Sequence, residues 1–214
     1  MRKNRIALVF VFMMVCGICG TLVRAGGEQA SPPQGTPSAS SQPGSDRPLS
    51  PGAKFNYAVH HSILSPLAYA KSATLAGFSM AVDSEADRPY GMGAEGFGRR
   101  WADRMGRGTI KEFVGSGTAA SLLHEDPRYF HSPNRAFGAR VRYALTRVLI
   151  TRTDGGTNRF NTHNVIGIFT AEGIAYSWRP DSSQRNVKNY FQRVGQTLAW
   201  DGLSKLLKEF RGKQ

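Results

Sequence analysis

The residues best suited to chemistry lie in one short polar segment that runs from His124 to His131. This segment offers imidazoles, two neighbouring carboxylates and a guanidinium, so it could supply a general acid or base and hold an anionic group. One hypothesis is therefore a hydrolase in which His124 or Glu125 acts as acid or base, and in which Asp126 and Arg128 face the same pocket.

A structural interpretation of the same residues is equally direct. Pro127 disfavours helix at Asp126, and the Asp126 side chain can cap the turn that Pro127 opens. His124 stands where the end of a helix stabilises an imidazolium, and Arg128 can pair with Asp126. We favour this interpretation, because the segment lacks any established spacing of a nucleophile or of metal ligands.

A metal site would need three or four converging ligands. His124 and His131 do not have the i, i+4 spacing that places two imidazoles on one helix face, and the adjacent His60 and His61 point about 100° apart on a helix. We therefore expect no metal ion and no other cofactor. The residues considered as ligands are His124, Glu125, Asp126, His131 and His163.

Two other catalytic patterns are weak. Ser116 lies in a run of small residues without the GxSxG elbow of a serine hydrolase, although it could in principle pair with His124. The glycines between Gly91 and Gly96 lack a preceding strand, and Glu95 stands where a phosphate would lie. We expect these glycines to form a turn into a helix.

The first 25 residues have the pattern of a secretory signal peptide. A basic start precedes an apolar run from Ile6 to Cys19, which is shorter than the roughly 20 residues of a membrane anchor. Val23 and Ala25 place small residues at a cleavage site, so we expect an exported chain that begins at Gly26. The predicted location is the periplasm or cell envelope.

Export changes the interpretation of the charge. The chain has a formal net charge of +13, and loss of a leader with four basic and no acidic residues lowers it to +9. Outside the cytoplasm we expect no nucleic acid; an anionic lipid or an acidic envelope polymer is the natural partner of a basic surface. Both cysteines, Cys16 and Cys19, lie in the leader, which excludes disulfides and thiol chemistry from the mature chain.

Residues 26–50 are dominated by Gly, Ser, Pro and Gln, which predicts a flexible linker. Residues 51–214 then predict a single domain of the all-α class, a compact bundle of five to six helices. Asp154-Gly155 predicts a turn that can form the tip of a short hairpin. The predicted helices cover residues 53–82, broken at Pro66, then 94–123, 135–150, 163–176 and a last one after an Asp181 cap.

Two helical segments carry unusual compositions. Lys71 is the only Lys, Arg, Asp or Glu between Phe55 and Val82, so this segment is either buried on all sides or in contact with lipid. Residues 94–123 and 163–176 repeat Gly and Ala at four-residue intervals, which predicts close approach of two helices. The pattern does not decide whether these helices pack within one chain or between chains.

The predicted helix 135–150 carries arginines beside its apolar stripe. Arg140 and Arg147 flank one side of the stripe, and Arg142 flanks the other. Such arginines can cover apolar surface with their stems and keep their charge in water. We expect these three residues to form an anion-binding surface.

Together these segments resemble an uncharacterised family of exported bacterial helical proteins. The distinctive part is HEDPRYF within Leu122–Phe130, followed by the Arg-rich stretch 140–156, a helix start at Asn161 and the sequence YSWRP at 176–180. The resemblance covers about Tyr90 to Phe210. It implies an exported helical domain and nothing about chemistry.

The sequence thus favours a non-enzymatic envelope protein, a basic helical binding or structural module that associates with membrane or wall. The alternative is a periplasmic hydrolase that uses the segment His124-Glu125-Asp126-Arg128. A third option, a helical module that binds a protein partner without touching a membrane, requires only that the apolar segments be buried in one core.

Overall fold

The computed structural model describes residues 47–82, 85–180 and 186–211, and shows a mainly helical fold with one small sheet. Two of the helical segments, η1 and η3, are π-helices, and η2 is a 3₁₀ helix. The elements are α2 (Pro51–Val59), η1 (His60–Leu64), α3 (Pro66–Ala81), η2 (Glu85–Tyr90), α4 (Gly93–Lys111), η3 (Glu112–Ala119), α5 (Ala120–Leu122), β1 (Glu125–Asp126), α6 (Phe137–Thr146), β2 (Ile150–Thr153), β3 (Asn158–Phe160), α7 (Thr162–Ala175) and α8 (Val187–Arg211).

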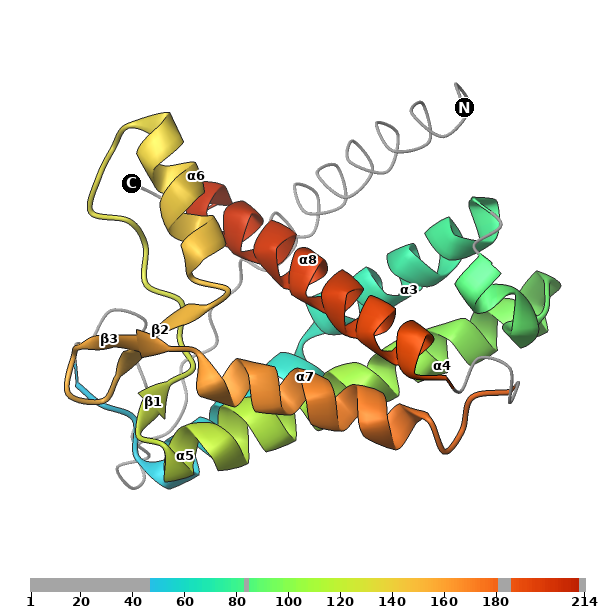
Figure 1. Ribbon diagram of the computed structural model, residues 1–214, viewed down its shortest axis with the longest axis horizontal. Coiled ribbons are helices and arrows are strands. Elements are labelled where there is room, and N and C mark those ends of the chain that lie inside the picture. Colours follow the sequence, from blue (N-terminus) through green and yellow to red (C-terminus); the bar gives the residue numbers. More distant parts are fainter. Residues whose placement is uncertain (1–46, 83–84, 181–185, 212–214) are drawn as a thin grey trace, which may run out of the picture.

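Two long interrupted helices form the base of the fold. The first, α2–η1–α3, packs along the second, α4–η3–α5, and α7 lies against α4 and η3. Helix α8 crosses these helices diagonally, and α6 packs on its C-terminal part (Figure 1). The predicted helical bundle is therefore confirmed, with the long helices 53–82 and 94–123 close to their expected bounds.

The helix starts follow from local sequence. Ser50 accepts a hydrogen bond from the backbone N–H of Ala53, which caps α2 just before Pro51. Pro66 begins α3 as predicted, with Ser65 at the cap position, although the Ser65 side chain makes no cap hydrogen bond. Asn161 caps α7 by accepting from the N–H of Asn164.

The hairpin predicted at Asp154-Gly155 is present. It joins β2 and β3 antiparallel, and β1 adds to the other side of β2 with Glu125 opposite Thr153. The positive φ that the turn needs is at Gly156 (+85°), one residue later than the Asp-Gly pair suggested. The helix predicted at 135–150 is shorter than expected, because α6 ends at Thr146, a turn follows, and β2 begins at Ile150.

The predicted close approach of small residues occurs within the chain, between η3 and α7. A Cβ added to Gly167 would lie 2.7 Å from the Lys111 carbonyl oxygen and 3.0 Å from the Cα of Gly115. A Cβ on Gly115 would lie 2.9 Å from the carbonyl oxygen of His163. Two backbones thus meet at this point where only glycine fits.

The interior is made of small and charged side chains. The buried apolar residues are mainly alanines, whereas six of the seven largest fully buried side chains are charged: Arg100, Arg179, Lys54, Glu125, Glu172 and Glu209. Lys54, for example, donates from Nζ to the Ala120 carbonyl (3.1 Å) and to Asp154 (2.7 Å). Buried charges need such partners, so the packing of these helices depends on ion pairs as well as on apolar contact.

Some predictions fall outside the described residues: the signal peptide, most of the linker 26–50 and the Asp181 cap. Within the described residues no helix is long and apolar enough to cross a membrane. The segment Phe55–Val82, expected either inside a core or against lipid, forms α2, η1 and α3, and it buries only one side.

Candidate functional site

The structure does not bring His124 together with Asp126 and Arg128. The His124 side chain is 83% exposed, its backbone φ is +54°, and its Nδ1 lies 3.9 Å from Asp154. Asp126 instead caps the Pro127 turn by accepting from the backbone N–H of Arg128 at 3.0 Å, and pairs with the Arg128 guanidinium at 2.6 Å. The predicted convergence of the three side chains on one pocket is therefore wrong, and the structural interpretation of Asp126 and Arg128 is confirmed.

Glu125 points away from this pair, as the alternation of side chains along a strand requires. Its carboxylate accepts from the backbone N–H of His163 at 2.9 Å and lies 2.7 Å from His163 Nδ1. Burial raises the pKa of Glu125, but the hydrogen bonds from His163 more than offset this, so the pKa is lowered. Glu125 thus joins β1 to the N-terminus of α7, where the helix dipole favours a carboxylate.

The structure also bears on the predictions made for Ser116, for a metal site and for the glycines from Gly91 to Gly96. Ser116 donates to Glu112 at 2.7 Å, and no contact with His124 is present. In the three described stretches of chain, no group of three His, Cys, Asp or Glu side chains could hold a metal ion. Gly91 and Gly93 adopt positive φ and lead into α4, which confirms the predicted turn.

The three arginines expected on one anion-binding surface have different environments. Arg140 pairs with the buried Glu209 at 2.8 Å and fixes α6 to α8. Arg147 bonds to Asn158 and to the Tyr143 hydroxyl, both at 2.8 Å. Arg142 is exposed. The prediction for Arg140 is wrong, because a guanidinium held by a buried carboxylate serves the packing of the two helices.

A buried ionic network connects α4, α7 and α8. Glu172, 2% exposed, accepts from Arg107 at 2.6 Å, from Arg179 and from Thr197 at 3.3 Å. Arg107 also bonds to Asp103 at 2.8 Å. Burial opposes the charge of Arg107, but Asp103 and Glu172 more than offset this and raise its pKa. Arg107 therefore stays charged at neutral pH.

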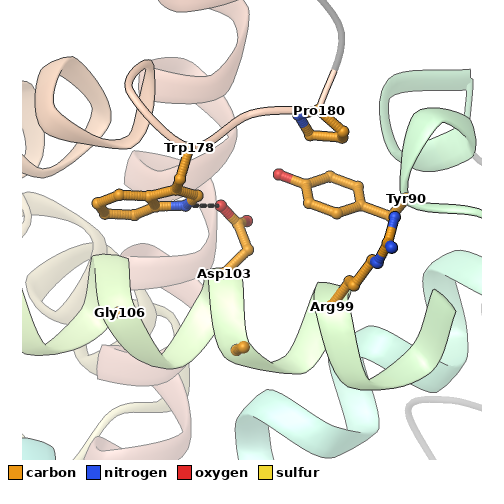
Figure 2. A pocket seen from close by; sticks show the side chains of 7 residues that line it. Tyr90, Arg99, Asp103, Gly106, Trp178 and Pro180 are labelled. Carbon is orange, nitrogen blue, oxygen red and sulfur yellow. Dashed lines mark hydrogen bonds between the residues drawn. The ribbon is translucent and has the colours of Figure 1, made fainter. Parts of the chain in front are cut away.

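An open cleft of about 490 Å³ lies above this network, between α4 and the segment after α7 (Figure 2). Trp178 donates its indole N–H to Asp103 at 2.9 Å, and its ring lies on α4 beside Gly106, where an added Cβ would be 3.7 Å from the indole. The lining residues are Tyr90, Arg99, Ala102, Asp103, Gly106, Trp178 and Pro180.

The Tyr90 hydroxyl points into the cleft (Figure 2). The residue is 5% exposed, and its hydroxyl makes no hydrogen bond within the structure as described. Burial and then the negative charge of Asp103 raise the pKa of Tyr90 to about 12, so the hydroxyl stays protonated and can donate. The Tyr90 hydroxyl and the Asp103 carboxylate thus form neighbouring parts of the wall of the cleft.

Large apolar side chains remain on the outside. Along the break between η1 and α3 the exposed fractions are 42% for Ile63, 57% for Leu64, 45% for Leu67 and 39% for Tyr69. We call these four residues the η1–α3 edge. Helices α2 and α3 bury small side chains, such as Ala58 and Ala76, against the rest of the fold. The uncharged segment thus turns its largest apolar groups outward.

The sequence interpretation missed Tyr90, Glu172 and Trp178. A signal was present for Glu172, because it is the one Asp, Glu, Lys or Arg in an otherwise uncharged α7, as Lys71 is in α3. Tyr90 and Trp178 carried no such signal, since only the tertiary fold brings η2 next to the segment that follows α7.

Comparison of the chain with protein-family models, with curated proteins and with solved structures finds no match. The resemblance carried by HEDPRYF therefore stays a prediction. The function has to be argued from the structure and the sequence of this chain.

Proposed function

We propose that the protein is an exported, non-enzymatic helical binding module of the cell envelope, which attaches to a membrane surface through its η1–α3 edge. The proposal rests on where the charged side chains and the large apolar side chains lie in the fold. Charged side chains fill the interior, whereas Leu64, Leu67 and their neighbours face outward. Large apolar groups gathered on a surface are typical of contact with lipid or with a partner.

The charge around the edge supports lipid as the surface. No acidic residue lies between Phe55 and Val82, so nothing on this segment repels anionic headgroups. His60, His61 and Lys71 lie on the same segment and are exposed. A basic helical surface with outward apolar side chains suits insertion to the depth of the headgroups, where both kinds of group are accommodated.

The depth of insertion follows from helix length and composition. The helices on either side of the break, α2 with η1 and then α3, are short and contain polar side chains such as Ser62, Ser72 and Ser79 on their buried side. Membrane contact would therefore be peripheral, with affinity given by the few exposed apolar side chains and by the net charge.

Flotation with liposomes tests the proposal. The mature chain, Gly26 to Gln214, is mixed with neutral or anionic vesicles at low and at high salt. We expect binding to anionic vesicles that salt weakens but does not abolish, because apolar insertion is not screened. The double variant Leu64→Ser, Leu67→Ser should lose most of the bound fraction at high salt.

A matched control removes apolar surface elsewhere. Phe191 in α8 is 57% exposed, the same fraction as Leu64, and packs near Phe169 with ring centroids 6.2 Å apart. Phe191→Ser should float like the wild type. Equal losses in both variants, or no flotation of the wild-type chain with any vesicle, would contradict attachment through the η1–α3 edge.

Export has a separate test. Expression of the full chain in a bacterial host, followed by fractionation and mass spectrometry of the intact protein, should give a chain that begins at Gly26. Recovery of the uncleaved chain from the cytoplasm would contradict the exported location.

A further inference from the structure

The face of α8 that crosses the base of the fold is polar. Ser204 and Lys205 lie three and four residues after Asp201, and Lys208 lies four and three residues after them, so the four residues share one side of the helix. Figure 1 shows α8 crossing in front of α3 and α4. The contacts across this crossing are made by long lysine side chains from the helices behind.

Three of these contacts are well defined. Lys111, at the end of α4, lies 2.7 Å from both carboxylate oxygens of Asp201. Lys71, from α3, donates to Ser204 at 3.0 Å. Lys205 donates to the carbonyl oxygen of Arg147 at 2.5 Å. The ammonium groups thus come from three elements, and their positions are fixed by polar neighbours.

Lys208 completes the group, and its ammonium makes no hydrogen bond within the described residues. Its positive charge acts on Lys71, on Lys205 and on the imidazole of His61. Glu112, which accepts from Ser116, is the second carboxylate that faces the group. We define the lysine cluster as Lys71, Lys111, Lys205 and Lys208.

The lysine cluster is not neutralised. Its four ammonium groups face two carboxylates, Asp201 and Glu112, which leaves an excess of two positive charges. Burial, together with the other lysines, lowers the pKa of Lys71 and Lys208, and lowers that of Lys205 to about 8. Ammonium groups that face one another repel, and an added anion relieves this repulsion.

We propose that the lysine cluster is a binding site for a dianionic phosphate group, carried by a phosphomonoester or present as free phosphate. Such a group has a charge of about −1.5 to −2 near neutral pH and three acceptor oxygens, which matches the excess charge and the unfilled donors of Lys208. Lysine is an established phosphate ligand in proteins. The site goes beyond the proposed membrane attachment and does not depend on it.

Calorimetric titration of the mature chain with inorganic phosphate at low salt and pH 7 tests the site. We expect saturable binding that Lys208→Gln weakens tenfold or more. Lys188→Gln is the matched control, because Lys188 is an exposed lysine of the same helix outside the cluster. No saturable binding, or equal weakening by both substitutions, would overturn the proposal.

Thermal unfolding separates loss of binding from loss of folding. Without phosphate, Lys208→Gln should unfold at the same or a higher temperature than the wild type, since one repelling charge is gone. With saturating phosphate the order should reverse, because only the wild type gains the full ligand stabilisation. A variant that is less stable than the wild type without phosphate, and by the same margin with it, would instead show a structural role for Lys208 and overturn the site.

The pH dependence of the affinity for phosphate gives an independent test of the site. Lys205 faces Asp201 and Lys208 on α8, Lys111 on α4 and Glu112 on η3. Above pH 8 inorganic phosphate is mainly dianionic, while Lys205, whose pKa is lowered to about 8, continues to lose its charge, so between pH 8 and 9.5 the affinity should fall several-fold. In Lys205→Arg, which stays charged at this position, the affinity should fall less over the same range, because only the other lysines of the cluster can lose charge. A parallel fall in that variant would contradict the role of Lys205.

Vesicles identify the source of the phosphate group. If a lipid headgroup supplies it, vesicles with a phosphomonoester lipid should bind the chain better than phosphodiester vesicles of equal surface charge, and Lys208→Gln should abolish the difference. If a soluble compound supplies it, Lys208→Gln should affect titrations with phosphate and leave flotation unchanged. Either result supports the site, whereas loss of flotation in Leu64→Ser, Leu67→Ser bears only on membrane attachment.

Discussion

Helices α3 and α7 look alike in sequence and behave differently in the fold. Each is an apolar helix with a single Asp, Glu, Lys or Arg, Lys71 in α3 and Glu172 in α7. Helix α7 lies against α4, η3 and α8, and its Glu172 is buried among arginines. Helix α3 packs mainly on α4, so Lys71 reaches out to α8 and Leu67 stays exposed. The number of neighbours, rather than composition, decided whether the lone charge became an internal ion pair or a surface group.

The most sensitive test of this difference is Glu172→Gln. The substitution leaves Arg107 and Arg179 buried with less compensating charge, and breaking a buried pair typically costs about 3–5 kcal/mol. We expect a loss of that size in the free energy of unfolding, measured with urea at pH 7. The control is Glu95→Gln, which removes an exposed pair with Arg99 and should cost under about 1 kcal/mol. Similar losses in both variants would show that the network contributes little to stability.

The glycines of the two helices give the second test. In α7, Gly167→Ala places a methyl group 2.7 Å from the Lys111 carbonyl, and we expect a loss of about 1–3 kcal/mol from the forced separation of α7 and η3. In α3, the Cβ of Gly77→Ala meets only Phe97 at 4.0 Å, so helix propensity should raise stability by up to about 1 kcal/mol. Opposite signs in urea unfolding are the expected result. A loss in both would mean that α3 is packed as tightly as α7.

The smallest effect is expected for the lone charge of α3. Burial lowers the pKa of Lys71, so the fold disfavours its charged form and removal of the charge should not destabilise the protein. Lys71→Gln should therefore change the free energy of unfolding by no more than about 0.5 kcal/mol at pH 7. A loss as large as that of Glu172→Gln would erase the contrast between the two helices.

Much of the fold was accessible from the sequence because the signals were local. The periodicity of apolar residues, Pro66, the Asn161 cap and the Asp154-Gly155 turn act within a few residues of the chain, and each is found at or next to its predicted place. The candidate site was less accessible. His124, Glu125, Asp126 and Arg128 are adjacent in sequence, but the strand turns Glu125 and Asp126 to opposite partners, which composition does not reveal.

By itself the sequence determined the helical class, the positions of most helix starts, the basic charge of the chain and the absence of cysteines after Cys19. Tertiary structure alone decided which charges are internal, that Tyr90 and Trp178 share a cleft, and that Lys71 and Lys111 reach Ser204 and Asp201 of α8. The physical reason is the separation along the chain over which each effect acts. Helix propensity and capping depend on neighbours along the chain, whereas burial, ion pairing and the pKa of a side chain depend on whatever the fold brings within a few ångströms.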